Sequence, residues 1–189
     1  RRFRLLDLMA STIEAEADAD EADRASDDST TVRRVVWFAG VIVLLLLVRS
    51  FVAEPMRVRS DSMAPTLSSG AVVLVDKISF RARDPHRGEI VVAVDPRTGE
   101  SIVKRVVAVG GDLVGIENGL LVVNGTSVVE KYIDNHNMDG FYFGPDAVPA
   151  GHVFLLGDNR ATSEDSRTFG PVAVDDIDGR LLATVWSSD

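Results

Sequence analysis

The stretch SIVKRVVAV, residues 101–109, is rich in β-branched residues and is interrupted by the charged pair Lys104 and Arg105. Such a run is typical of a β-strand, in which successive side chains point to opposite faces. Similar runs lie on both sides of it, separated by glycine, proline, aspartate and asparagine. These runs are AVVLVDKI (71–78), EIVVAVD (89–95), LVGIENGLLVVNG (113–125), HVFLL (152–156) and RLLATVW (180–186). From Val58 onward the sequence therefore predicts a mostly β domain of many short strands.

Two local signals refine this prediction. Asn118-Gly119 lies inside the run over 113–125, and this dipeptide is typical of a tight hairpin turn. Residues 130–150, EKYIDNHNMDGFYFGPDAVPA, show little periodicity. We expect an irregular excursion there.

The segment before the β runs is strongly apolar. Residues 35–48 carry no charge, and the stretch from Val35 to Ala53 is 19 residues long. As a helix it would measure about 28 Å, close to the hydrocarbon thickness of a bilayer. A buried core helix and a cleavable signal peptide are the alternatives, but the preceding residues are too many and too acidic for a signal peptide. We therefore expect a single transmembrane helix over residues 33–53, followed by an outer domain over residues 54–189.

The N-terminal segment has a different composition. Residues 14–31, EAEADADEADRASDDSTT, contain eight acids and one arginine. Such a tract cannot bury enough apolar surface to offset its chain entropy. We expect residues 1–32 to be a disordered acidic tail. Arg33 and Arg34 at the start of the apolar segment weakly favour a tail in the cytoplasm.

Composition excludes several classes of function. The formal net charge of -9 argues against nucleic acid as a partner, because phosphate binding needs a basic face. The chain contains no cysteine, so it has no disulfide, no thiolate nucleophile and no cysteine-ligated metal.

SDSMAPTL, residues 60–67, contains the candidate nucleophile, Ser62. A serine in a tight segment that contains proline fits that role, although the same residues also form ordinary turns. Only nine residues separate Ala53 from Ser62, and they span at most about 30 Å. If the apolar segment crosses a membrane, the chemistry at Ser62 takes place near the membrane surface.

Histidine is the usual base for a serine nucleophile. His86, His136 and His152 are each better read as surface or core histidines, and no GxSxG pattern is present. The motifs HExxH, GxGxxG and the P-loop are also absent.

Lysine is the alternative base, because Ser-Lys is a recognised variant of the catalytic triad. Such a lysine must be neutral, which requires burial among apolar groups. Lys77 follows Asp76, which would keep it charged, whereas Lys104 lies in the middle of the run over 101–109. The neighbouring Arg105 is equally surrounded, but a guanidinium does not deprotonate in a protein. A strand lysine that reaches solvent is the alternative reading of Lys104.

A polar loop, GDNRATSEDSRTFG (157–170), follows the last apolar run but one. It is either a solvated loop or a support for the site. In the second case it would supply a hydroxyl to hold the lysine amine and an ion-pair brace from Asp158, Asp165 and Arg167.

The anchor, SDSMAPTL, IVKRVVAVGGD and GHVFLLGDNRATSEDSRTFG occur in an order and spacing that resemble bacterial type I signal peptidases. The resemblance covers residues 35–186. It implies that Ser62 is the nucleophile, Lys104 the general base, and Ser60 an oxyanion donor beside the Ser62 N–H. It also implies that Ser163 holds the lysine amine. Asp158, Asp165 and Arg167 match residues that brace the site.

The resemblance further implies a mostly β fold with a coiled catalytic sheet and a reduced second lobe over residues 111–151. The implied substrates are exported preproteins, cleaved after a small-x-small sequence outside the cytoplasmic membrane, with no metal or cofactor. An extended substrate would add as a strand to an open sheet edge. The implied pocket residues are Met56, Val58, Met63, Leu67, Ile102 and Val103.

Arg59 and Asp61, on either side of Ser60, depart from the family pattern of proline and glycine. A carboxylate that pointed inward would disfavour an oxyanion, so we expect Asp61 to face solvent. Two other functions remain as alternatives. One is a self-cleaving repressor-type Ser-Lys protease, and the other is a catalytically silent, membrane-tethered β module.

Overall fold

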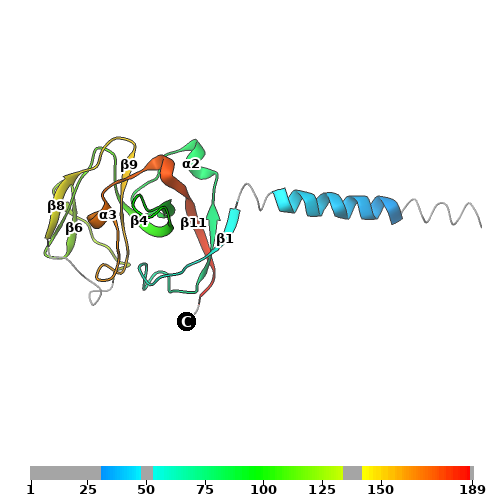
Figure 1. The fold of residues 1–189 in the computed structure, drawn as a ribbon, viewed down its shortest axis with the longest axis horizontal. Coiled ribbons are helices and arrows are strands. Elements are labelled where there is room, and N and C mark those ends of the chain that lie inside the picture. Colours follow the sequence, from blue (N-terminus) through cyan, green and yellow to red (C-terminus); the bar gives the residue numbers. More distant parts are fainter. Residues whose placement is uncertain (1–30, 48–52, 134–141, 188–189) are drawn as a thin grey trace, which may run out of the picture. The chain divides into compact units, whose positions relative to one another are not determined.

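The computed structural model describes residues 31–47, 53–133 and 142–187, and divides the chain into a unit over residues 1–48 and a unit over residues 49–189 (Figure 1). In the first unit, residues 31–47 form an α-helix whose side chains are almost all exposed. No helix within the described ranges is long and apolar enough to span a membrane. The predicted anchor over 33–53 and the predicted tail over 1–32 both extend into residues outside the described ones.

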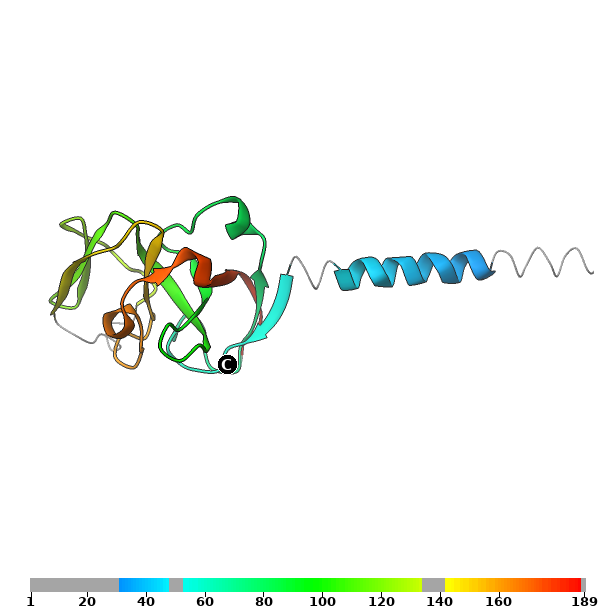
Figure 2. The ribbon, with the colours of Figure 1, turned by 45° about the horizontal axis from the view of Figure 1, so that its top comes forward.

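The second unit is mostly β, as the sequence predicts. Its larger sheet has seven strands in the order β1-β2-β11-β3-β4-β9-β10, all paired antiparallel. The strands are β1 (Ala53–Arg57), β2 (Val72–Asp76), β3 (Ile90–Val94), β4 (Ser101–Val109), β9 (His152–Leu156), β10 (Val172–Ala173) and β11 (Ile177–Trp186). Short helical turns join them: α2 (Ser79–Ala82), α3 (Ser166–Phe169) and the 3-10 turn η2 (Val174–Asp176). The sheet curls into a half-barrel, which the two views of Figures 1 and 2 show from different directions.

A smaller sheet has the strand order β7-β6-β5-β8. Its strands are β5 (Leu113–Glu117), β6 (Leu120–Val123), β7 (Thr126–Ser127) and β8 (Tyr142–Ala147). Asn118 and Gly119 both have positive φ, 51° and 79°, which confirms the predicted hairpin turn between β5 and β6. The sheet lies within the range expected for a small second lobe.

The expectation of an irregular excursion over 130–150 is wrong for β8. The strand sequence YFGPDA is mostly exposed and lacks alternation, so periodicity gives no sign of it. Pairing with β5 forms this strand, and the register shifts between Val114 and Ile116, opposite the Gly144-Pro145 step. Tertiary pairing therefore overrides a weak local preference.

Three clusters of buried side chains form the core, and the central strands β3, β4 and β9 are packed on both faces. One cluster lies between the two sheets and includes Phe154 and Ile116. A second contains Met63 and Leu67, and a third contains Val91 and Leu155. Burial on both faces explains why the strand sequences read as nearly continuous apolar runs rather than as alternating ones.

Candidate active site

Ser62 lies in a turn that follows β1, and the core holds this turn in place. Met63 is completely buried and Leu67 is 2% exposed, both in one cluster with Val58. The carbonyl of Asp61 accepts a hydrogen bond from Ala64 N–H at 3.1 Å. The buried side chains of Met63 and Leu67 thus anchor the turn to the core, while Ser62 remains partly exposed.

Ser60 and Ser62 bring their hydroxyls together at an Oγ–Oγ distance of 3.1 Å. Between them, Asp61 is exposed, and its Oδ1 accepts a hydrogen bond from Ser69 N–H at 2.9 Å. The carboxylate is therefore exposed to solvent, as expected. In the described part of the chain the Ser62 N–H donates no hydrogen bond.

Lys104 is buried in β4, with only 4% of its surface exposed. Its neighbour across the β3–β4 pair is Val91, which is completely buried. Burial lowers the pKa of the Lys104 amine, and this effect outweighs the opposing attraction of Asp165. Among the described residues the amine has no ion pair and no hydrogen-bonded partner. Lys104 is thus disposed toward the neutral form, the form that can accept a proton.

The polar loop after β9 is folded by Asp165. Its carboxylate accepts a hydrogen bond from Gly157 N–H at 3.0 Å and forms an ion pair with Arg167, with Nε 2.8 Å from Oδ1. Arg167 also donates to the backbone carbonyls of Arg160 and Ser163. The pair therefore holds the two ends of the loop against each other.

The same loop packs closely on the nucleophile segment. A Cβ added to Gly157 would lie 2.5 Å from the backbone carbonyl oxygen of Ser62, and it would also clash with the side chain of Ser163. Gly157, Ser62 and Ser163 are therefore immediate neighbours. Ser163 Oγ is buried and has no partner within the described residues.

Asp158 joins three segments that are far apart in sequence. Arg105 Nε donates to Oδ1 at 2.8 Å and Arg105 Nη2 to Oδ2 at 2.6 Å, while Thr66 Oγ1 donates to Oδ2 at 2.5 Å. Asp158 is completely buried and Arg105 is 8% exposed. This bidentate pair ties β4 and the loop to the segment that carries Ser62.

A second buried ion pair, which no sequence pattern indicates, lies behind the loop. Arg160 is 2% exposed, donates to the Gly157 carbonyl at 3.0 Å, and pairs with Glu130 at 2.7 Å. Tyr132 donates its hydroxyl to Glu130 and lies under the guanidinium of Arg105, whose Cζ is 3.7 Å from the ring centroid. Glu130 and Tyr132 belong to a segment that we expected to be irregular. No local pattern identifies them, because their partners are about 30 residues away.

Five of the six predicted pocket residues pack together beside Ser62. Val58, Met63 and Leu67 are buried in one cluster, and Met56 and Val103 are packed against it. Ile102 packs in the cluster on the other side of the sheet, because side chains alternate along β4. Of the pair Ile102 and Val103, only Val103 lies with Met63.

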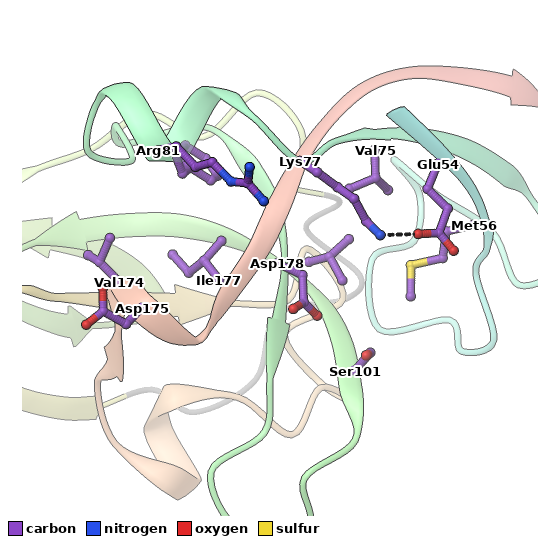
Figure 3. Close-up of a pocket in the computed structure, with 12 residues that line it drawn as sticks. Glu54, Met56, Val75, Lys77, Arg81, Ser101, Val174, Asp175, Ile177 and Asp178 are labelled. Atoms are coloured by element: carbon purple, nitrogen blue, oxygen red, sulfur yellow. Dashed lines mark ion pairs between the residues drawn. The ribbon is translucent and has the colours of Figure 1, made fainter. Parts of the chain in front are cut away.

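A cavity of about 840 Å³ opens beside this apolar group (Figure 3). Residues of β1, β2, α2, β3, β4, η2 and β11 line it, including Met56, Val92 and Ser101. Lys77 and Glu54 form an ion pair on its wall, drawn as a dashed line in Figure 3. The cavity is thus lined by both apolar and charged side chains.

Comparison with known proteins identifies the family. The family described as signal peptidase, peptidase S26, matches residues 31–186. Signal peptidase I of Leptolyngbya laminosa is 34% identical over 173 residues, which cover 87% of this chain and 84% of that protein. Signal peptidase I of Bacillus caldolyticus is 37% identical over 166 residues, which cover 82% of this chain and 90% of that protein. A solved structure of a signal peptidase I from Enterococcus faecalis has 30% sequence identity and a TM-score of 0.48, and the match covers 53% of this chain and 98% of that one.

The chain therefore belongs to the S26 family of signal peptidases, serine endopeptidases that remove signal peptides from preproteins. This family membership sets aside the alternative of a self-cleaving repressor-type protease.

Proposed function

We propose that Ser62 is the nucleophile of this peptidase and that Lys104 is its general base. The observation that carries the proposal is the buried Lys104 amine, whose pKa is lowered by desolvation and which has no ion-pair partner in the described part of the chain. A lysine of this kind can take up a proton from a hydroxyl, because burial favours its neutral form over its charged form. The loop that packs on the Ser62 turn also carries Asp165 and Arg167, whose charges act on the Lys104 amine.

The reaction proceeds in two halves. Ser62 Oγ attacks the scissile carbonyl carbon while Lys104 Nζ takes the hydroxyl proton. The C–N bond then breaks, and Lys104 returns the proton to the leaving amine, which leaves an ester on Ser62. Water attacks the ester and gives a proton to Lys104. The bond between the acyl carbon and Ser62 Oγ then breaks, and Lys104 returns the proton to Ser62 Oγ. No metal or cofactor takes part in these steps.

The Ser62 N–H and the Ser60 hydroxyl form the oxyanion site in this proposal. The Ser62 N–H donates no hydrogen bond among the described residues, so it is available to a developing negative charge. The Ser60 hydroxyl, 3.1 Å from Ser62 Oγ, is close enough to donate to the same oxygen. Both donors lie on one turn, which limits their relative motion.

Ser163 acts as the group that orients the lysine amine. Its Oγ is buried with no partner in the described residues, which costs free energy unless a nearby donor uses it. The ammonium or amine of Lys104 is such a donor. Asp158, Asp165 and Arg167 act one layer further out, because each holds the loop or β4 through buried ion pairs.

The substrate is a preprotein with small residues before the cleavage site, bound as an added strand. β4 pairs with β9 only from Arg105 onward, so within the described residues 101–104 keep an open edge. Peptide strands commonly add to such an edge. We assign the pocket for the small side chains to Met56, Val58, Met63, Leu67 and Val103, and leave out Ile102 because it packs on the other side of the sheet. These five residues pack in one apolar cluster, which supports a pocket for small apolar side chains.

Residues 33–53 anchor the enzyme in the cytoplasmic membrane. The acidic tail over 1–32 lies in the cytoplasm, and the catalytic domain over 54–189, with its reduced second lobe over 111–151, lies outside. The length and apolar character of the segment support this arrangement. We expect the full chain to stay with membranes after washing at alkaline pH. External protease should cleave the β domain but spare the tail in intact spheroplasts, and release of the chain by the wash would contradict the anchor.

Activity should rise with pH through the pKa of Lys104. Because burial places this pKa below that of a free lysine, the neutral fraction, and with it kcat/KM, increases as the pH rises and then levels off above the shifted pKa. The measurement is kcat/KM on a preprotein substrate from mildly acidic to alkaline pH. A profile that stays flat over this range would count against Lys104 as the base.

A further inference from the structure

Asn159 makes two hydrogen bonds to the backbone around the nucleophile. Its backbone N–H donates to the Ser62 carbonyl at 3.0 Å. Its side-chain Nδ2 donates to the Asp61 carbonyl at 3.2 Å. One residue of the loop therefore binds the carbonyl groups on both sides of the Ser62 Cα.

The contact with Asp61 determines where the Ser62 N–H points. The Asp61 carbonyl and the Ser62 N–H belong to the same peptide group, which is planar, and in the trans form these two bonds point in opposite directions. Holding the carbonyl toward the loop therefore turns the N–H away from the loop. The N–H is also a free donor among the described residues, as an oxyanion donor must be.

The Asp61 carbonyl is held from two sides. It accepts from Ala64 N–H at 3.1 Å within the turn, and from Asn159 Nδ2 across to the loop. A carbonyl oxygen has two lone pairs, so these donors occupy both. The hydrogen bond from Ala64 lies within the turn and does not restrain the peptide group relative to the rest of the domain. The hydrogen bond from Asn159 ties the peptide group to a second segment.

The unsatisfied oxygen of the Asn159 side-chain amide indicates that the hydrogen bond from its nitrogen is the contact that matters. Asn159 Oδ1 is buried and has no partner in the described part of the chain. A flipped amide would place this oxygen against the Asp61 carbonyl, so the network itself assigns Nδ2 to the contact. Burying an unpartnered acceptor costs free energy, and the orientation of the amide keeps Nδ2 on the peptide group next to Ser62.

We propose that Asn159 is a positioning residue that locks the Asp61–Ser62 peptide group, so that the Ser62 N–H stays aimed at the developing oxyanion. The proposal rests on the proposed function of Ser62. Asn159 touches neither the substrate nor the reacting atoms, and it acts only through the peptide group that it holds. Its effect should appear in the transition state and not in substrate binding.

The test compares Asn159→Ala with Thr162→Ala, an exposed residue of the same loop, in the full chain in detergent. Loss of a complete oxyanion donor costs about 10²–10³-fold in kcat. A donor that is present but poorly aimed should cost less, and we expect kcat to fall about 10–100-fold in Asn159→Ala. KM and the midpoint of the pH profile should stay within about twofold of the wild-type values, because neither the groove nor Lys104 is altered. Thr162→Ala should behave as wild type.

A second measurement separates positioning from a general structural role. A substrate-like peptide aldehyde forms a tetrahedral adduct with a nucleophilic serine, whereas a non-cleavable peptide of the same sequence only fills the groove. Asn159→Ala should weaken the aldehyde by about the same factor as kcat/KM and leave the non-cleavable peptide unchanged, because only the adduct carries the charge of the transition state. Equal weakening of both ligands, or an unchanged kcat, would overturn the proposal. Failure of the proposed function would look different, because the aldehyde would then bind Ser62→Ala as tightly as wild type.

Discussion

Ser62→Ala and Lys104→Met should each lower kcat by on the order of 10⁴-fold or more, with little change in KM. Ser62→Ala removes the oxygen that forms the acyl-enzyme. Lys104→Met removes the only group near β4 that we assign to accept the proton, and it replaces a buried amine with an apolar side chain of similar length. Because the two residues act as a unit, the double variant should be no slower than the slower single variant.

Folding and base chemistry can be separated with matched variants. Lys104→Met should not destabilise the domain, because it removes the cost of burying an amine at a site that is 4% exposed. Lys104→Arg should be inactive at every pH, because a guanidinium stays protonated. The controls are Ser127→Ala and Lys131→Met at exposed positions, which should retain full activity. Substantial preprotein cleavage by either Ser62→Ala or Lys104→Met would refute the Ser-Lys mechanism, and a wild type without activity would support the silent β module.

Gly157→Ala should lower kcat by about 10²-fold or more, because small displacements of a nucleophile have large kinetic effects. The new Cβ would sit 2.5 Å from the Ser62 carbonyl oxygen and would also meet the Ser163 side chain. The first of these is backbone and the second is a short, buried side chain, so neither can move aside easily. Overpacking of this kind typically costs about 1–3 kcal/mol of stability. The loss of kcat is measured with a preprotein substrate, and the loss of stability is measured by thermal unfolding of the full chain.

Two variants show whether the position or merely the loss of a glycine matters. Gly99→Ala lies at the β3–β4 turn, where an added Cβ meets nothing within 4 Å. Its positive φ of 73° predicts some loss of stability but full activity per folded molecule. Adding Ser163→Gly to Gly157→Ala should not restore kcat, because it relieves only the side-chain clash and also removes the hydroxyl that we assign to the lysine amine. Wild-type kcat in Gly157→Ala would mean that the close approach of the loop is not needed.

Much of the fold follows from local sequence properties. The β-branched runs over 101–109 and 152–156 coincide with β4 and β9 at both ends. The Asn118-Gly119 turn was predictable because its residues readily adopt positive φ. β8 was not predictable, because its exposed sequence carries no alternation and the strand exists only through its pairing with β5.

For the candidate site, too, some features could be predicted from the sequence and others could not. SDSMAPTL, Lys104 and the polar loop could be singled out as three blocks, because a hydroxyl, an amine in an apolar run and a dense set of polar groups are visible in the residues. Their contacts could not be predicted. The Arg105–Asp158 pair, the Arg160–Glu130 pair and the placement of Asn159 all join residues that are distant in sequence. A chain read residue by residue carries no information on which of its charges will be buried together.

By itself the sequence determined that this chain forms a mostly β domain and which hydroxyls and amines are present for chemistry. Both follow from side-chain type and from patterns that repeat over a few residues. Only the tertiary structure decided that Lys104 is desolvated, that Arg105 pairs with Asp158, and that Ile102 and Val103 face different clusters. Those outcomes depend on strand register and on the curl of the sheet, because burial, and the pKa that follows from it, belong to the packed assembly of strands and not to any single segment.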